Sequence, residues 1–222
     1  RIRSLQLMEH AATLVEQQAS PGQAAAFYLA YASQVLAGRG QYGAWKLNAL
    51  SDTSKLPDYE KGHHYGWRHG KAPPGAPVDK EGNPMYHHVP ESFKSAPTDG
   101  ERWRWLLHRA KTIDPGVANN VAWTFAEFLH GQFGVQTMAE YGWFFHGARS
   151  RQADVKKDIS GTFQLHTLDR DETITKLATG IRRFTLPNEF DYMRIYQGFT
   201  EDPQSGYSES ALNKLAEIFS NR

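Results

Sequence analysis

The sequence predicts an all-α fold made of irregular αα-hairpins, with one long loop rich in proline and glycine inserted between them. Two observations lead to this prediction. Apolar residues recur at steps of three and four in most stretches of the chain, which is the spacing of one face of an α-helix. Seven of the eleven prolines fall within residues 52–97, and no helix can cross that segment.

The composition is that of a globular domain without a general attraction for nucleic acids or membranes. The chain has 222 residues, 40% of them hydrophobic, which is enough for a sizeable core. The formal net charge is +1, so the basic excess typical of nucleic-acid-binding proteins is missing. No apolar run approaches the roughly 18 residues that a membrane-spanning helix needs. Because the chain has no cysteine, it forms neither a disulfide nor a thiolate metal site.

Helical hairpins are predicted at the N-terminus, in residues 1–51. Three helices are expected there: residues 4–18, a helix that starts at Ser20-Pro21 and ends at Gly38 or Gly40, and residues 42–51. Residues 52–98 follow as a long loop. Disordered linkers have few aromatic residues, so the aromatic content of this loop predicts that it is ordered. A small turn or hairpin is expected around Gly82.

The central αα-hairpin and a following helix are predicted over residues 99–147. Asp99 is the expected N-cap of its first helix. Asp114-Pro115-Gly116 ends that helix, because proline cannot donate a backbone hydrogen bond and glycine tolerates the turn. The second helix places four apolar residues on one face: Val121, Phe125, Phe128 and Leu129.

The C-terminal part is predicted as a flexible insertion at residues 148–170, followed by helices over residues 171–222. Asp171 would cap a short helix at residues 172–179, and residues 181–186 would be extended. Further helices are expected at residues 188–199 and from Ser208 onward, the last with Leu212, Leu215 and Phe219 on one side. We expect all these parts to form one domain. Because the chain starts at Arg1 without methionine, we also expect it to be a segment of a longer polypeptide.

Three fragments resemble the tetratricopeptide pattern of roughly 34 residues. They are FYLA with GRGQY (residues 27–30 and 38–42), HRAKTIDP (residues 108–115) and LAEIFSNR (residues 215–222). Helical pairs recur in the chain without a strict period. The resemblance implies an irregular, tetratricopeptide-like helical-repeat scaffold.

Nine short phrases spread over residues 54–190 form a second set of similarities. They are SKLPDY (54–59), GAPVD (75–79), GNP (82–84), VPESF (89–93), DGERWRW (99–105), QFGVQT (132–137), DETI (171–174), LATG (177–180) and LPNEF (186–190). Together they resemble the N-terminal helical region of very large bacterial proteins of the alpha-2-macroglobulin family. The resemblance implies an exported protein, periplasmic or extracellular, with β-sandwich domains further along. That family is associated with trapping proteases, in some members through a Cys–Gln thioester, which a chain without cysteine does not contain.

Five loop histidines are the candidates for a metal site: His63, His64, His69, His87 and His88. Neutral imidazole binds zinc, copper and nickel ions, and three or four converging rings would define a site. The spacing is not that of a helical pair, and adjacent residues in an extended segment point to opposite faces. We therefore predict no metal and no other cofactor. A metal-binding module or a metal-dependent enzyme built on these histidines remains an alternative.

Residues 102–105 (RWRW) interleave arginine with tryptophan, as nucleic-acid-binding surfaces do. On a helix, however, the two tryptophans point about 200° apart. We expect Trp103 in the core and Trp105 under the long loop, with the arginines in solvent or paired with acids such as Asp99. This interpretation excludes a nucleic-acid partner.

The loop aromatics Tyr59, Tyr65 and Trp67 are candidate contacts with a protein partner, because Tyr and Trp are frequent in such contacts. The competing interpretation is that loop aromatics anchor the loop on the helices. It is favoured for Trp67 and for Tyr86, and Tyr65 is left open between the two.

Paired carboxylates are better explained as helix caps than as catalytic acids and bases. They occur at Asp58/Glu60, Asp169/Asp171/Glu172 and Glu189/Asp191. The chain has neither a G-x-S-x-G nucleophile motif nor a complete phosphate-binding loop. We therefore predict that it is not an enzyme.

The predicted function is a non-catalytic helical scaffold or protein-interaction segment of a larger exported protein of alpha-2-macroglobulin type. Its partner would be another protein or other domains of the same polypeptide. A subunit of an extracellular or cell-envelope assembly is a further alternative. Neither nucleic-acid binding nor membrane insertion is expected.

Overall fold

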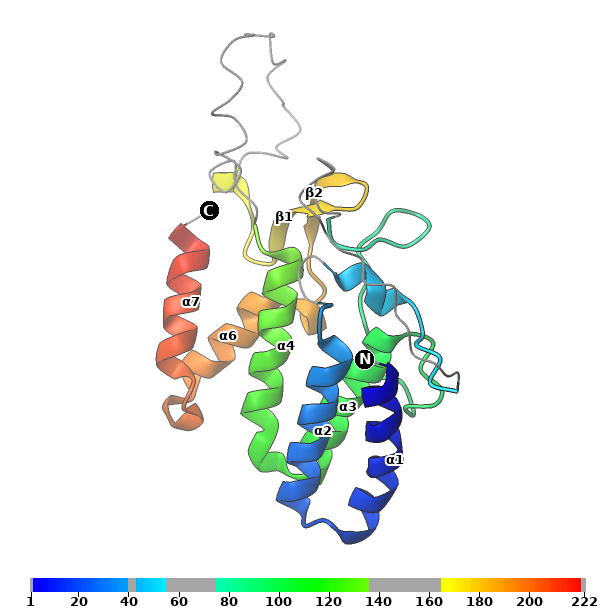
Figure 1. Cartoon of the computed structure of the whole chain (residues 1–222). Helices are drawn as coiled ribbons and strands as arrows, with labels where there is room; N and C mark the ends of the chain where they lie inside the picture. The colour runs from blue at the N-terminus through cyan, green and yellow to red at the C-terminus, as the bar shows by residue number, and fades with distance from the viewer. Residues whose placement is uncertain (1, 40–42, 55–74, 136–164, 221–222) are drawn as a thin grey trace, which may run out of the picture.

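A computed structural model of the chain shows four helices packed side by side, with two more on the other side of the fourth (Figure 1). The structure describes residues 2–39, 43–54, 75–135 and 165–220. The α-helices in these ranges are α1 (Ile2–Gln18), α2 (Pro21–Leu36), α3 (Asp99–Ile113), α4 (Ala118–Phe133), α6 (Tyr192–Glu201) and α7 (Ser208–Ser220). The prediction of a mostly helical fold is thereby confirmed. None of the described helices is long and apolar enough to span a lipid bilayer.

Short 3-10 helices link the longer elements: η1 (Ala44–Asn48), η3 (Pro115–Val117), η4 (Leu165–Thr167), η5 (Asn188–Phe190) and η6 (Pro203–Ser205). The first of them corrects the prediction of a full helix at residues 42–51. Gly43 at its start approaches the backbone of Gly38 so closely that a side chain there would overlap it. The chain therefore turns tightly here, where a longer helix was expected.

The core lies where α3 packs along α2 and against α4. Trp103 is fully buried, and its ring centroid lies 4.6 Å from that of Phe128 and 6.1 Å from that of Phe125. Tyr28 of α2 is also buried, with its hydroxyl donating to Glu16 of α1 at 2.8 Å. The predicted placement of Trp103 in the core is confirmed.

A two-stranded antiparallel sheet replaces the predicted helix at residues 172–179. Strand β1 (Glu172–Leu177) pairs with β2 (Gly180–Thr185), and Gly180 follows the two-residue turn with a φ of +131°. Thr173 and Thr175 are buried, and their hydroxyls donate to the carbonyls of Phe133 and Gln132 at the end of α4. β1 thus satisfies helix-end carbonyls that would otherwise lack a partner.

The chain before α3 runs along this sheet. Ala76 forms a parallel bridge with Leu177, and its N–H donates to the carbonyl of Lys176 at 2.8 Å. A tight turn closed by a bridge between Val78 and Pro84 confirms the small hairpin expected around Gly82. We call residues 76–88 the strap, because they cross from β1 to the start of α3.

Of the last two helices, α6 begins later than predicted, whereas α7 begins at Ser208 as predicted but buries a different set of side chains. α6 begins at Tyr192, where the Asp191 carboxylate accepts hydrogen bonds from the backbone N–H groups of Met193 and Arg194. α7 buries Ala211, Leu215 and Ile218. Leu212 and Phe219, which were expected on the same side as Leu215, are 55% and 46% exposed.

The start of α3 is held by a buried ion pair rather than by an Asp99 cap. Thr98 is the N-cap, and its hydroxyl accepts from the N–H of Glu101 at 3.2 Å. Asp99 is 1% exposed and pairs with Arg39, just beyond α2, while the N–H of Ser51 donates to it at 2.9 Å. Burial alone would raise the pKa of Asp99, but hydrogen bonds from Ser51 and Arg39 outweigh it and lower that pKa.

Replacing Asp99 should weaken the fold in a pH-dependent way. We expect Asp99→Asn to lower the free energy of unfolding by about 3 kcal/mol at neutral pH, because Arg39 is left as an uncompensated buried charge. The folded-state pKa of Asp99 is depressed, so its contribution is complete above the unfolded pKa of about 3.9 and is lost as the pH falls through the folded pKa. Urea unfolding of both proteins at neutral and acidic pH measures this. A difference that does not shrink in acid would contradict it.

Candidate functional site

The residues predicted for a site fall partly outside the described structure. His63, His64 and His69 lie there, as do the interaction candidates Tyr59, Tyr65 and Trp67. Most of the predicted flexible insertion at residues 148–170 also lies outside. Of the metal candidates, the structure describes His87 and His88, both at the end of the strap.

His87 and His88 do not converge on a common point. His87 is buried beside Phe128, whereas His88 is exposed, with Nδ1 3.5 Å from the Glu189 carboxylate. Within the described ranges, no three histidine or carboxylate side chains gather where they could hold a metal ion. His87 and His88 therefore give the metal hypothesis no support.

The residues of the RWRW segment all contribute to packing. Trp105 contacts the loop ring of Phe93, with centroids 5.9 Å apart, as expected. Arg102 lies over the same ring, 4.8 Å from its centroid, and also donates to the carbonyl of Ser51.

Arg104 of the same segment is buried, with its guanidinium 3.5 Å from the ring centroid of Phe125. It also pairs with Glu189 at 2.9 Å. This pair was not predicted, because 85 residues separate its two members along the chain.

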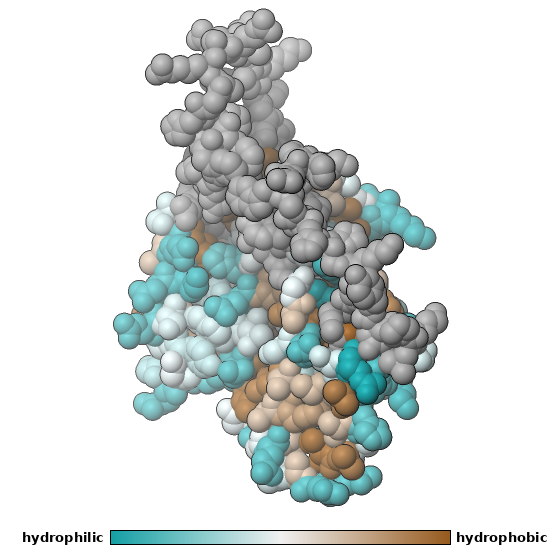
Figure 2. Space-filling model, in the orientation of Figure 1, coloured by the Kyte–Doolittle hydropathy of each residue, from teal (hydrophilic) through white to brown (hydrophobic). Residues whose placement is uncertain are grey.

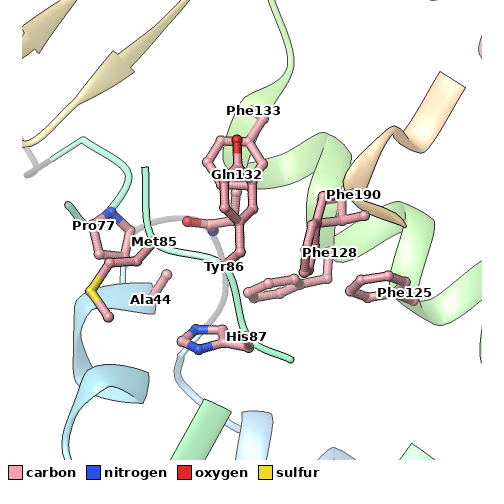
Figure 3. A pocket seen from close by; sticks show the side chains of 11 residues that line it. Ala44, Pro77, Met85, Tyr86, His87, Phe125, Phe128, Gln132, Phe133 and Phe190 are labelled. Atoms are coloured by element: carbon pink, nitrogen blue, oxygen red, sulfur yellow. The ribbon is translucent and has the colours of Figure 1, made fainter. Parts of the chain in front are cut away.

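A small pocket lies under the strap, between η1, α4 and the end of η5 (Figure 3). Most of its lining is apolar: Ala44, Pro77, Met85, Tyr86, Phe125, Phe128, Leu129, Phe133 and Phe190. Besides the hydroxyl of Tyr86, the polar groups in the lining are the imidazole of His87 and the amide of Gln132. Tyr86 anchors the strap by contacts with Phe133 and Phe190, which supports the packing interpretation of this residue.

The polar groups of the pocket are neutral. Burial, together with the nearby charges of Arg104 and His88, lowers the pKa of His87 to about 4. Gln132 is 5% exposed, and neither of its amide atoms has a hydrogen-bond partner within the described structure. The free space is about that of one water molecule, so the pocket suits a buried water better than a substrate.

A second candidate is the outer face of α2, which we define by the exposed Ala26, Ala30 and Ser33 together with the half-buried Leu29 and Leu36. Among these five residues the one polar group is the hydroxyl of Ser33, and the exposed Gln23 lies one turn before Ala26 on the same side of the helix. Not one charged residue occurs in the 16 residues of α2. The inner side of the same helix is buried against α3 and α1, so the outer face is the side that these helices leave open.

The neighbouring helix adds to the exposed apolar surface. Leu7 and Leu14, seven residues apart on α1, are 60% and 51% exposed. Figure 2 shows apolar surface gathered in the lower part of the molecule, over the α1–α2 pair. Contiguous apolar surface of this kind marks an interaction site more often than single exposed leucines do.

Sequence reasoning had identified α2 as a helix but missed its outer face as a site. The signal was present, because a helix that carries no charge on any side is normally buried all round. By residue type, a row of small side chains carries no signal of a site, whereas histidines and aromatics do.

The close packing of His87 against α3 can be tested by adding one methyl group at Gly100. A Cβ added at Gly100 would overlap the imidazole of His87, so we expect Gly100→Ala to lower the free energy of unfolding by about 1–3 kcal/mol. Gly198, inside α6, has no atom within 4 Å of its Cβ position. Gly198→Ala should therefore be neutral or stabilise by up to about 1 kcal/mol, through its helix propensity. Equal effects of the two substitutions in urea unfolding would contradict this geometry.

Comparison of the chain with protein-family models, with curated proteins and with solved structures gives no match. Its function must therefore be inferred from the arrangement of its own residues.

Proposed function

We propose that this chain is a non-catalytic protein-interaction domain, a helical scaffold that binds a partner polypeptide through the outer face of α2. The observation that carries the proposal is that α2 has no charged residue although its outer face is exposed, and that the neighbouring helix α1 carries two exposed leucines. Surface helices of globular proteins place charged and polar residues on the side away from the core. The composition of α2 is that of a helix covered on both sides.

The shape of this face favours a helical partner. Ala26, Ala30 and Ser33, at steps of four and three, leave a shallow strip along the helix, so that a second helix can approach closely. Leu29 and Leu36 border the strip and offer larger apolar side chains. A charged partner surface would find no complementary charge on α2, so the partner segment should be apolar.

The distribution of charged residues supports a structural rather than a catalytic role. Arg39 and Asp99 hold α3 against the end of α2. Arg104 is committed to Glu189 and to the carbonyl of His87, and Asp191 caps α6. The buried charges among them have the partners that a stable fold requires.

The wider context of the proposal comes from the sequence resemblances. The adjacent antiparallel pair α1 and α2 is compatible with a tetratricopeptide-like scaffold. The alpha-2-macroglobulin-like phrases suggest that the domain belongs to a larger exported protein, in the periplasm or outside the cell. The partner would then be another protein or another domain of the same polypeptide.

Site-specific photo-crosslinking tests the proposed surface. Benzoylphenylalanine placed at Ala30 and activated in the native cell should give an adduct of discrete mass, because a covering partner lies within reach of the probe. Ala216 is the matched control, since it is an exposed alanine on α7. We expect no adduct at Ala216, and we expect Ala26→Glu to abolish the adduct formed at Ala30. Equal labelling at both positions would mean that the outer face of α2 is simply exposed to solvent.

A further inference from the structure

We propose that the end of the strap, residues 86–88, is an acid-released latch: protonation of His87 expels its ring from between α3 and α4 and lifts this segment off the pocket. At neutral pH the latch is closed and covers the pocket lined by Ala44, Tyr86 and Gln132 (Figure 3). In acid it opens and exposes that lining to solvent. This change is separate from partner binding at the outer face of α2, and neither requires the other.

The imidazole of His87 fills a tight site between two helices. The residue is 5% exposed, and its ring lies against Phe128 of α4, with centroids 6.3 Å apart. It also touches the backbone of α3 at Gly100, where an added Cβ would lie only 2.3 Å from Nδ1. A space too small for a methyl group is also too small for a counter-ion. A proton on this ring would therefore create a buried cation with no room for a compensating charge beside α3.

The charged groups around the ring disfavour a proton on it. Arg104 of α3 places its guanidinium next to the ring and donates to the backbone carbonyl of His87 at 3.1 Å. His88, the next residue of the strap, adds a second cation when it is protonated. Glu189 of η5 pairs with these two groups instead, 2.9 Å from Arg104 and 3.5 Å from His88. Glu101 of α3 interacts with His88 as well.

The other elements around the ring contribute uncharged side chains to the pocket. From α4 these include Phe128 and the amide of Gln132, and from η1 there is Ala44. An amide does not offset the charge of a buried cation. Burial, with the two neighbouring cations, therefore lowers the pKa of His87 to about 4 while the latch is closed. In solvent the ring regains its ordinary pKa of about 6.5.

Side chains rather than backbone pairing hold the end of the strap in place. Tyr86 packs on Phe133 and Phe190, with ring centroids 5.4 and 4.5 Å away. Within the described ranges, no backbone–backbone hydrogen bond joins residues 86–88 to the rest of the chain, whereas residues 76–85 make such bonds with β1 and with each other. Segments held in this way open at a lower cost than global unfolding. The strap end can therefore lift while the helices stay packed.

The difference between the two pKa values sets the direction and the pH window of the release. Because the closed latch binds the proton less well than the open one, opening becomes easier as the pH falls from about 6.5 toward about 4. Above this window both forms are neutral, and below it both are protonated. The ratio of open to closed molecules should therefore rise roughly 30-fold between pH 7.5 and pH 5.

A single engineered thiol under the strap measures this opening. Ala44 lines the pocket and is 2% exposed, and the chain has no cysteine, so Ala44→Cys carries one thiol that is covered until the strap lifts. Its labelling by a pyridyl disulfide, divided at each pH by the rate for the urea-unfolded chain, should accelerate roughly 30-fold from pH 7.5 to pH 5. Ala32→Cys, at a core position of α2 that is 1% exposed, reports global unfolding and should react much more slowly at both pH values.

Replacing His87 separates its proton from the other effects of acid. His87→Leu, combined with Ala44→Cys, keeps an apolar side chain in the site but has no proton to take up, so the acceleration in acid should be lost. His108, exposed on α3, provides the matched control. His108→Leu, in the same Ala44→Cys background, should leave the roughly 30-fold acceleration unchanged.

Nuclear magnetic resonance of the unmodified chain gives a readout that does not depend on how the variants fold. In the closed protein the ring of His87 should take up its proton well below pH 6.5. Titration of His87 near pH 6.5 with the strap still closed would overturn the latch, because the buried site would then accept the proton without penalty. Labelling at position 44 that is independent of pH, or no faster than at position 32, would overturn it too.

Discussion

The packing of α3 along α2 is the interaction on which the rest of the structure depends. It buries Trp103 of α3 and both Tyr28 and Tyr31 of α2 in the core. At one end, the buried pair of Arg39 and Asp99 fixes the start of α3 against the end of α2. Because α3 occupies one side of α2 and α1 another, the remaining side is the one whose composition calls for a partner.

The strap and the β-hairpin complete the opposite end of the bundle. Two buried threonines of β1 bind the last carbonyls of α4, and Ala76 joins the strap to the same strand. Arg104 then ties the strap to α3 by donating to the carbonyl of His87 at 3.1 Å. The pocket enclosed by these contacts holds two unusual polar groups, but its size and its neutral lining fit a structural role. Function is therefore better sought on the outside of the helices.

The sequence was most informative where periodicity is long and the end signals are local. Both conditions hold for residues 4–18, 20–37 and 99–133, and the structure has helices in all three ranges. Residues 181–186 are extended as predicted, but residues 172–179 misled because a short run after an aspartate resembles a capped helix. The three consecutive β-branched residues of β1, Thr173, Ile174 and Thr175, were a strand signal, but their burial depends on α4, which is distant in sequence. The pairing of Asp99 with Arg39 could not be predicted either, since 60 residues separate the two along the chain.

For the candidate site, too, residue types could be identified from the sequence, but their arrangement in space could not. Histidines and loop aromatics could be identified from residue type alone, yet their convergence depends on tertiary structure. The outer face of α2 became visible as a site only when the structure showed which side α3 had already covered. The lack of charge on α2 can be seen in the sequence. Without knowledge of the packing, however, it fits a fully buried helix as well as a helix that binds a partner.

A partner on the outer face of α2 should shield that face when the protein is in its native setting. Hydroxyl-radical footprinting measures this directly by comparing the oxidation of Leu29 in the native cell and in the dilute purified chain. Leu212, exposed on α7, serves as the internal reference. We expect Leu29 to be protected in the cell relative to Leu212 and to become reactive on dilution. Equal reactivity of Leu29 in the two settings would contradict a covered face.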